Sequence, residues 1–391
     1  MRIDFVPRRE GISNEFEIFD DRSTCRQGPT ALRFPLSTYH GGDIYSNSVN
    51  IDFSVSLNPY VTDELKTVMG EAAAEGMASA GVYPDPEQRA VRSAIADMEN
   101  VEPECVYAGS GASELLLAIA RMCNPKKALL IEPCYSGYGY ALNCIRDCGI
   151  KRHLLKEDEG FCLTEDVLAA FTEDIDMVFL ADPNNPTGRN IDGNLLEKIL
   201  DRASELNISV VLDRSFYMLS DAYAKNTDEK YSELILKYKN LFVIKSFTKC
   251  FALPGIRMGY VISGADNVFK LIRYLPEWNL SSVSNAYMRR LSCFAKDGKF
   301  FNDSIKMIKT ERDFLTRELS ENGFDVIKSD ANYLLIKSQK NIYEKLLSKK
   351  ILVRKCDDFR GLDERFYRIA VRGREENNLL IDNLVTLITD L

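Results

Sequence analysis

Short apolar runs alternate with longer amphipathic stretches through the middle of the chain. The amphipathic stretches carry apolar residues at helical spacing, as in VTDELKTVMGEAAAEGM (61–77), QRAVRSAIADMEN (88–100) and NLLEKILDRASELN (194–207). The apolar runs are short and bounded by turn residues, which is typical of buried strands. They are KALLIEP (127–133), DMVFLADP (176–183), ISVVLDRS (208–215), NLFVIKS (240–246) and MGYVIS (258–263). Strands that alternate with helices predict an α/β domain with a largely parallel sheet.

The pattern changes after Trp278. Two helical patterns are followed there by two strand-like runs, at 285–294, 304–323, 331–338 (ANYLLIKS) and 367–372 (YRIAVR). This order predicts a second, smaller α+β domain, with a boundary near 275–280, where Pro276 interrupts the pattern. We therefore expect an N-terminal extension at 1–38, a segment of the small domain at 39–58, the large domain at 59–277 and the small domain at 278–391.

Composition narrows the classes of function. The net charge of −8 does not favour binding to nucleic acid or to an anionic membrane, and no apolar run reaches the length of a membrane span. The N-terminal residues lack the apolar core of a signal peptide. Ten cysteines without a CxxC pair indicate reduced thiols in a cytoplasmic protein, and two histidines argue against a metal site.

Polar residues follow several of the predicted strands at the point where each strand ends. Asp182-Pro183-Asn184-Asn185-Pro186-Thr187-Gly188 follows one strand, and Asp213 ends the next. The segments Ser246 to Lys249 and Pro133-Cys134-Tyr135 follow two others. Ligands of open α/β sheets bind beyond the carboxyl ends of the strands, so these groups are expected at one site.

This set of residue types suits pyridoxal phosphate. A lysine amine can bond covalently to the cofactor's aldehyde, and a carboxylate can pair with its pyridine nitrogen. The turn Gly109-Ser110-Gly111 precedes a predicted helix, and the N-terminus of a helix binds phosphate through its free N–H groups. Each residue taken singly also has a structural interpretation, as a surface lysine, a turn residue or a core aromatic. Their order along the chain favours the functional one.

Two segments carry a specific likeness to a known family. SFTKCFALPGIRMGY (246–260) and ADPNNPTG (181–188) resemble the lysine and Asn-Pro-Thr-Gly motifs of the class I/II aminotransferases, the fold-type I pyridoxal-phosphate enzymes. The likeness extends over nearly the whole chain from His40 onward. It implies a large domain with a seven-stranded, mostly parallel sheet and a smaller α+β domain.

The resemblance also implies roles for single residues. Lys249 matches the Schiff-base lysine and proton shuttle, Asp213 the partner of the pyridine nitrogen, Asn185 the donor to the ring oxygen, and Tyr135 the stacking aromatic. The cofactor phosphate would be held by Ala112, Ser113, Ser246, Thr248 and Arg257, and by Tyr83 of a neighbouring subunit, which implies a homodimer with shared active sites.

The substrate site is expected at two arginines. Arg368, in FYRIAVR, matches the arginine that binds the substrate carboxylate. Several segments resemble the threonine-phosphate decarboxylase branch of the family, whose relative is the histidinol-phosphate aminotransferase branch, and this implies a small phosphorylated amino acid as substrate. By that likeness Arg354, His40 and Gly41 also contact substrate, although Arg354 could instead pair with Asp357 or Asp358. Ser56 is also expected at the substrate, although it stands where both branches usually have asparagine, and Asn185 is expected to contact substrate as well as cofactor.

The pattern leaves the reaction open. Decarboxylation is favoured and transamination is the alternative. The bond of the substrate's α-carbon that lies perpendicular to the cofactor ring is the one that breaks, and the sequence does not give this orientation. Phe216 fits the decarboxylase branch, whereas Arg214-Ser215 departs from the usual Glu-Ala after Asp213. A non-catalytic, ligand-sensing relative is a more remote alternative.

Overall fold

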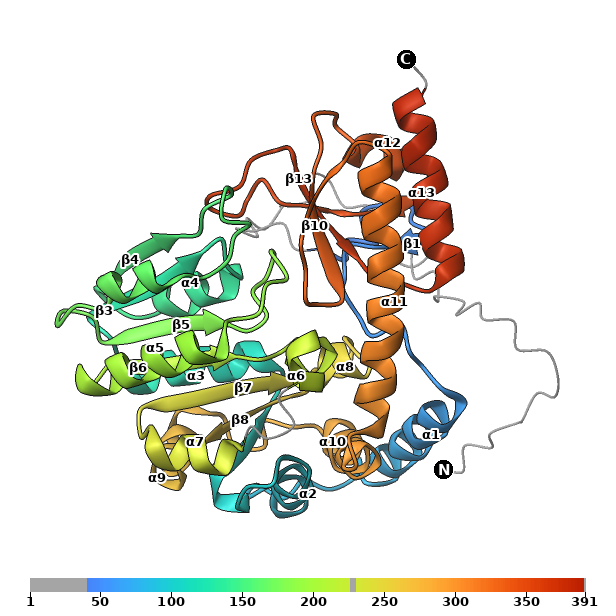
Figure 1. The fold of residues 1–391 in the computed structure, drawn as a ribbon. Helices are drawn as coiled ribbons and strands as arrows, with labels where there is room; N and C mark the ends of the chain where they lie inside the picture. The colour runs from blue at the N-terminus through green and yellow to red at the C-terminus, as the bar shows by residue number, and fades with distance from the viewer. Residues whose placement is uncertain (1–40, 226–229, 390–391) are drawn as a thin grey trace, which may run out of the picture. The chain divides into compact units, whose positions relative to one another are not determined.

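The structure is a computed structural model that describes residues 41–225 and 230–389. By its internal contacts the chain divides into two units, Met1–Tyr39 and His40–Leu391. The first unit, and with it the expected extension at 1–38, lies outside the described residues, as does His40. The description that follows concerns the second unit (Figure 1).

A seven-stranded sheet forms the centre of this unit, as the sequence predicts (Figure 1). Its strand order is β2-β8-β7-β6-β5-β3-β4, and all neighbours are parallel except at β8, which is antiparallel to both β2 and β7. The strands are β2 (Val106–Gly109), β3 (Lys127–Glu132), β4 (Gly149–Leu154), β5 (Met177–Ala181), β6 (Ser209–Asp213), β7 (Leu241–Ser246) and β8 (Gly259–Ser263).

The strand pattern did not indicate β2 and β4, the two edge strands. β4 reads GIKRHL and is partly exposed, because an edge strand carries charged residues on its open side. β2 is only four residues long and ends in glycine. The five interior strands are the apolar runs of the sequence.

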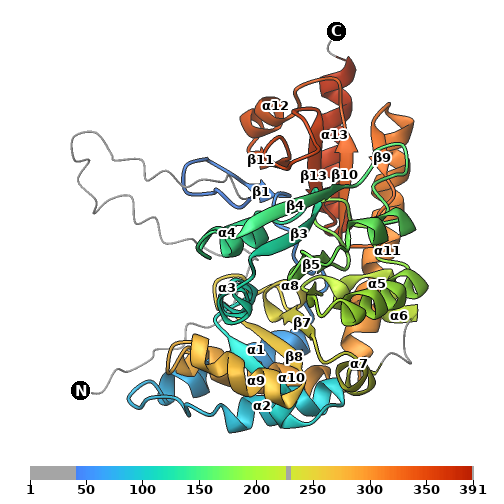
Figure 2. The same ribbon diagram turned by 90° about the vertical axis from the view of Figure 1, so that its left-hand side faces the viewer.

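Helices cover both faces of this sheet because its buried side chains alternate between two clusters. Leu129, Val178 and Val210 belong to one cluster, which includes the apolar face of α5. Ala128, Met177 and Val211, each next to one of these residues, belong to the other cluster, which includes residues of α3, α4 and α9. Figure 2 shows α3 and α4 on one side of the sheet and α5 on the other. The helices are α3 (Ala112–Cys123), α4 (Ser136–Asn143), α5 (Gly193–Glu205), α7 (Tyr231–Lys237) and α9 (Ala265–Leu271).

Two smaller sheets are formed by strands from the C-terminal part of the chain together with β1, the first strand. One is antiparallel, in the order β12-β13-β10-β9, and the other is a parallel pair of β1 with β11. They consist of β1 (Ile51–Asp52), β9 (Asp325–Ile327), β10 (Tyr333–Lys337), β11 (Ile351–Leu352), β12 (Arg354–Lys355) and β13 (Phe366–Ala370). Their buried side chains form a separate core with α12 (Tyr343–Ser348) and α13 (Arg374–Thr389).

One long helix, α11 (Lys299–Glu321), connects the two cores. Phe300 and Ile308 pack in the core of the large sheet, whereas Leu315 and Leu319 pack in that of the small sheets. The preceding helix, α10 (Ser282–Ala295), packs against α1 (Asp63–Ala78) and α2 (Arg89–Glu99). The expected domain boundaries stay a prediction.

The remaining helices are short. They are α6 (Asp221–Lys225), α8 (Phe247–Cys250) and the 3₁₀ turns Pro103–Cys105, Glu165–Ala170, Tyr217–Leu219 and Ile272–Tyr274. Within the described ranges no helix combines the length and the hydrophobicity that crossing a bilayer requires. The same ranges contain no group of three or more His, Cys, Asp or Glu side chains placed to hold a metal ion.

Candidate active site

A cavity of about 1070 Å³, open to solvent, lies beyond the carboxyl ends of β5, β6 and β7. Most of the site residues that the sequence predicts line it together, although they come from segments far apart in the chain. They are Gly41, Ala112, Ser113, Tyr135, Asn185, Asp213, Ser246, Thr248, Lys249, Arg257, Arg354 and Arg368.

Lys249 enters the cavity from the short helix α8, which follows β7 directly. The hydroxyl of Ser246 caps this helix by accepting a hydrogen bond from the N–H of Thr248, at 3.2 Å. Burial and the positive charges of Arg368 and Arg257 lower the pKa of Lys249 to about 8. The amine is therefore neutral in a larger share of molecules than an ordinary lysine is, which makes it a better nucleophile at neutral pH.

Asp213 faces the cavity from the end of β6, where it is buried. Its two carboxylate oxygens accept hydrogen bonds, among them one from the hydroxyl of Tyr138 at 2.8 Å and one from the N–H of Ser215 at 2.9 Å. Burial raises the pKa of Asp213, while these hydrogen bonds oppose the rise. A buried carboxylate of this kind gains from a cationic ligand group, such as a protonated ring nitrogen.

One end of the cavity is built to receive an anion. Helix α3 begins there, at Ala112, without a side-chain cap on its free N–H groups. Gly111 precedes it with φ of 84°, and a Cβ at this glycine would come within 2.7 Å of the guanidinium of Arg257. Arg257 itself has φ of 61°, a conformation that non-glycine residues adopt rarely and that is common at functional sites.

The hydroxyls of Ser246 and Thr248 lie at the same end. Both donate to the carbonyl of Met258, at 3.1 and 3.2 Å. This shared acceptor orients the two side chains beside Arg257 and leaves their oxygens able to accept or exchange a hydrogen bond.

Two further arginines of the cavity are Arg368 and Arg354. Arg368, on β13, donates to the side-chain oxygen of Asn185 at 2.5 Å and to the carbonyl of Ser54 at 2.8 Å, and its buried Nε has no partner. Arg354, on β12, donates to both carboxylate oxygens of Asp358, at 2.9 and 2.7 Å. Arg354 therefore lines the cavity and also pairs with Asp358, while its contact with substrate stays a prediction.

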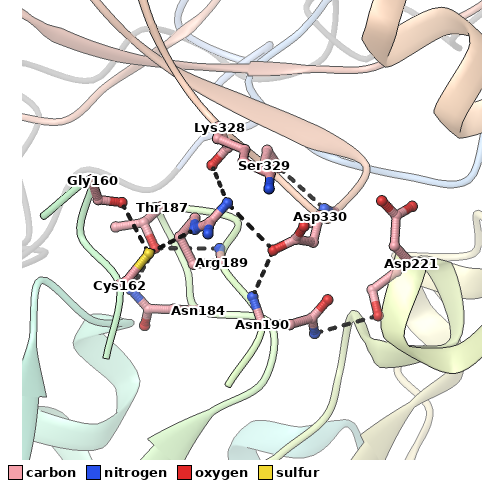
Figure 3. A network of polar contacts seen from close by, with 12 residues as sticks. Gly160, Cys162, Asn184, Thr187, Arg189, Asn190, Asp221, Lys328, Ser329 and Asp330 are labelled. Carbon is pink, nitrogen blue, oxygen red and sulfur yellow. Dashed lines mark hydrogen bonds and ion pairs between the residues drawn. The ribbon is translucent and has the colours of Figure 1, made fainter. Parts of the chain in front are cut away.

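The loop that carries Asn185 is held by a network of polar contacts (Figure 3). Arg189 donates to the sulfur of Cys162 at 3.2 Å and lies 3.6 Å from the carboxylate of Asp330. The N–H of Asn190 donates to the same carboxylate at 3.1 Å. Asp330 precedes β10, so these contacts join the loop after β5 to the small antiparallel sheet. Asn185 on this loop and Arg368 on that sheet are hydrogen-bonded to each other.

Two expected site residues do not line the cavity. Tyr83 is 79% exposed, and its ring lies 4.7 Å from that of Trp278. Ser56 is fully buried, and its hydroxyl has no hydrogen-bond partner.

Other cavity residues were not predicted as site residues, including Ser54, Val55, Tyr138, Ser215 and Phe359. Tyr138 had a usable signal, since it lies one helical turn after Tyr135 and therefore points to the same side. Phe216, which the sequence singled out only as a branch marker, also lines the cavity, and its ring centre lies 5.8 Å from the amine of Lys249.

Residues 50–384 match the family model described as aminotransferase class I and II. The chain belongs to the class I and II aminotransferase family. Among curated members, it is 28% identical over 369 residues to a threonine-phosphate decarboxylase of Salmonella typhimurium, covering 91% of this chain and 98% of the relative. It is 33% identical over 353 residues to a putative threonine-phosphate decarboxylase of Caldanaerobacter subterraneus subsp. tengcongensis, covering 88% and 92%. The crystal structure of the histidinol-phosphate aminotransferase from Clostridium acetobutylicum has a TM-score of 0.78 at 26% identity, covering 87% of this chain and all of that one.

The aminotransferase family uses pyridoxal phosphate, and the cavity fits this cofactor. The uncapped start of α3 and Arg257 suit its phosphate, the buried carboxylate of Asp213 suits its ring nitrogen, and Lys249 supplies a partly neutral amine for its aldehyde. The family and its cofactor expected from the sequence are thus confirmed.

Proposed function

We propose that this enzyme decarboxylates a small phosphorylated amino acid, with L-threonine O-3-phosphate as the favoured substrate. The observation that carries the proposal is that two further arginines, Arg354 and Arg368, line the cavity besides Arg257. Arg257 is accounted for by the cofactor phosphate, so the other two can receive two anionic groups on the substrate. A carboxylate and a phosphate on one small molecule meet this requirement.

The protein groups divide the work between the cofactor and the substrate. Ala112, Ser113, Ser246, Thr248 and Arg257 would hold the cofactor phosphate, and Tyr135 would lie against the ring. Asp213 would keep the ring nitrogen protonated, and Asn185 would donate to the ring oxygen. When bound, the cofactor supplies a ring that accepts the electron pair left at the substrate's α-carbon.

Lys249 would move the proton. With its pKa lowered to about 8, the Lys249 amine would be suited to transfer a proton to or from the substrate's α-carbon at neutral pH. Arg368 would orient the substrate carboxylate, and Arg354 the second anionic group. The angle that these two arginines impose on the α-carbon decides which of its bonds breaks.

Transamination is the second candidate, because the histidinol-phosphate aminotransferase has the same fold at 26% identity. The test is to incubate the holoenzyme with O-phospho-L-threonine, and separately with L-histidinol phosphate and 2-oxoglutarate. Carbon dioxide released without glutamate supports decarboxylation. Glutamate formed in the second reaction contradicts it in favour of transamination, and Lys249→Ala serves as the inactive control for both.

We also propose that the enzyme is a cytoplasmic homodimer with shared active sites. The exposed pair of Tyr83 and Trp278 supports the dimer, because large aromatic side chains on a surface are common at protein interfaces. The described cysteines are all free thiols, which supports a reducing compartment.

A further inference from the structure

Arg354 and Arg368 lie directly opposite each other on neighbouring strands but have different partners. Their Cα atoms are paired in the register of β12 with β13. Arg368 donates hydrogen bonds to two neutral oxygens, those of Asn185 and Ser54. Arg354 has a full charge partner, since its Nη2 bonds both carboxylate oxygens of Asp358. The two cavity arginines are therefore not equivalent sites for an incoming anion.

Like charges directly opposite on a sheet repel each other, and both guanidiniums here are buried. Asp358 reduces that repulsion by neutralising Arg354. It also means that the Nη2 of Arg354 already has an anionic partner before a substrate anion binds. A substrate anion that binds Arg354 must either displace the Asp358 carboxylate or bind more weakly because that carboxylate repels it.

Asp358 is placed so that it can leave. The side chain of Arg354 is 6% exposed, whereas that of Asp358 is 24% exposed and lies in the turn between β12 and β13. A rotation of the aspartate side chain therefore returns its carboxylate to water, while the arginine stays in the cavity wall beside Phe359, whose ring centre is 5.1 Å away.

We propose that the Asp358 carboxylate competes with the substrate's second anionic group for Arg354. This inference rests on the proposed function, since it takes Arg354 as the site of that group. A phosphate dianion offers more charge and more acceptor oxygens than a carboxylate, so it displaces Asp358 where a weaker anion does not. Asp358 is then a specificity-determining residue that sets how tightly the second anionic group of a substrate is bound.

The test compares the holoenzyme with Asp358→Asn, which keeps the shape of the side chain and removes its charge. Binding of O-phospho-L-threonine and of L-threonine is measured from the change in the cofactor's visible spectrum. We expect the Kd of O-phospho-L-threonine to fall about ten-fold in the variant, which corresponds to about 1.4 kcal/mol. The Kd of L-threonine, which has no anion to place at Arg354, stays within about two-fold.

Asp357→Asn is the matched control. It makes the same change of charge one residue away, where the aspartate pairs with Lys355 at 2.8 Å instead of with a cavity residue. It should change neither Kd, and both variants should keep the melting temperature and visible spectrum of the parent enzyme.

Unchanged or weaker binding of O-phospho-L-threonine in Asp358→Asn overturns the inference, since Asp358 would then only orient Arg354. Equal tightening in the Asp357 variant overturns it too, because the effect would be one of net charge. The outcome is separate from that of the proposed function. If Asp358→Asn binds O-phospho-L-threonine more tightly but the enzyme releases no carbon dioxide, the competition for Arg354 is supported and the proposed decarboxylation is rejected. If carbon dioxide is released but binding does not tighten, only the role of Asp358 is rejected.

Discussion

At the scale of single residues, Lys249 and Asp213 acquire their chemistry from where they are buried. Burial disfavours the charged form of each, so it lowers the pKa of the amine and raises that of the carboxyl. The two arginines add to the effect on Lys249, whereas hydrogen bonds keep Asp213 closer to its ionised form. The sequence shows the residue types, and their surroundings make one a nucleophile and the other a charge partner.

The lowered pKa of Lys249 predicts how covalent uptake of the cofactor depends on pH. Only the neutral amine attacks an aldehyde, so the rate should rise with pH and level off above the pKa of about 8. At pH 7 about a tenth of the Lys249 amines are neutral, against about three in ten thousand for an ordinary lysine. The measurement is the gain of visible absorbance after mixing cofactor-free protein with pyridoxal phosphate between about pH 6 and about pH 10. A midpoint near 10 would contradict it, and Lys249→Ala should show no gain at any pH.

Tyr138→Phe tests the support of Asp213. The substitution removes the 2.8 Å hydrogen bond to the carboxylate and leaves the ring in its packing against Phe179. A hydrogen bond to a charged group contributes about 1.5–3 kcal/mol, so we expect the cofactor to bind at least about ten-fold more weakly. Affinity is measured by titrating cofactor-free protein. Tyr107→Phe, which loses only a 3.3 Å bond to the carbonyl of Pro86, should bind the cofactor normally, and equal affinities of the two variants would refute the role of Tyr138.

At the scale of elements, a buried ion pair joins the ends of β5 and β6. Arg214, directly after Asp213, donates to the carboxylate of Asp182 at 3.1 Å, and both side chains are almost fully buried. Asp182 also accepts from the side chain of Asn190 at 2.7 Å. Arg214, which departs from the usual glutamate after Asp213, is thus paired with Asp182. This pair connects the strand that ends in Asp213 to the loop that carries Asn185.

Arg214→Met should destabilise the protein by about 3–5 kcal/mol, because it leaves the carboxylate of Asp182 buried without its countercharge. Unfolding by urea, without cofactor, measures the loss. Adding Asp182→Asn should recover part of it, since the buried charge is then removed. The matched control is Lys237→Met, which breaks an exposed pair with Glu197 and should cost less than about 1 kcal/mol. A loss at Arg214 no larger than that control would mean that the pair does not hold the strand ends together.

At the scale of the whole molecule, the proposed dimer accounts for the one expected cofactor contact that lies away from the cavity, Tyr83. Its ring is exposed beside Trp278, and a partner subunit could bring a second cavity to it. The dimer predicts a particle of about twice the 44.3 kDa of the chain.

Mixed dimers test the sharing of sites. Lys249→Ala chains keep Tyr83, and Tyr83→Ala chains keep Lys249, so a mixed dimer contains one site with both residues intact. We expect each variant alone to have little activity and a refolded mixture to regain part of it, measured as carbon dioxide release from O-phospho-L-threonine. A mixture no more active than the average of its components would show that Tyr83 serves its own subunit or none.

The sequence alone determined the fold class, the family, and the group of residues at the strand ends. Parallel strands end at one edge of a sheet, so the order of motifs along the chain placed Asn185, Asp213 and Lys249 at one site before any coordinates. The hydrophobic pattern did not predict the edge strands β2 and β4, because short or exposed strands lack the apolar run by which interior strands are recognised.

Only the tertiary structure decided which residues complete the site. Arg368 meets the carbonyl of Ser54 across 314 positions of sequence, and Arg354 lies opposite Arg368 because of the register of two short strands. No local pattern encodes such contacts, since they depend on how separately formed elements pack. For the same reason the sequence left two roles open for Arg354. The structure shows this arginine in the cavity wall and paired with Asp358, and its contact with substrate stays a prediction.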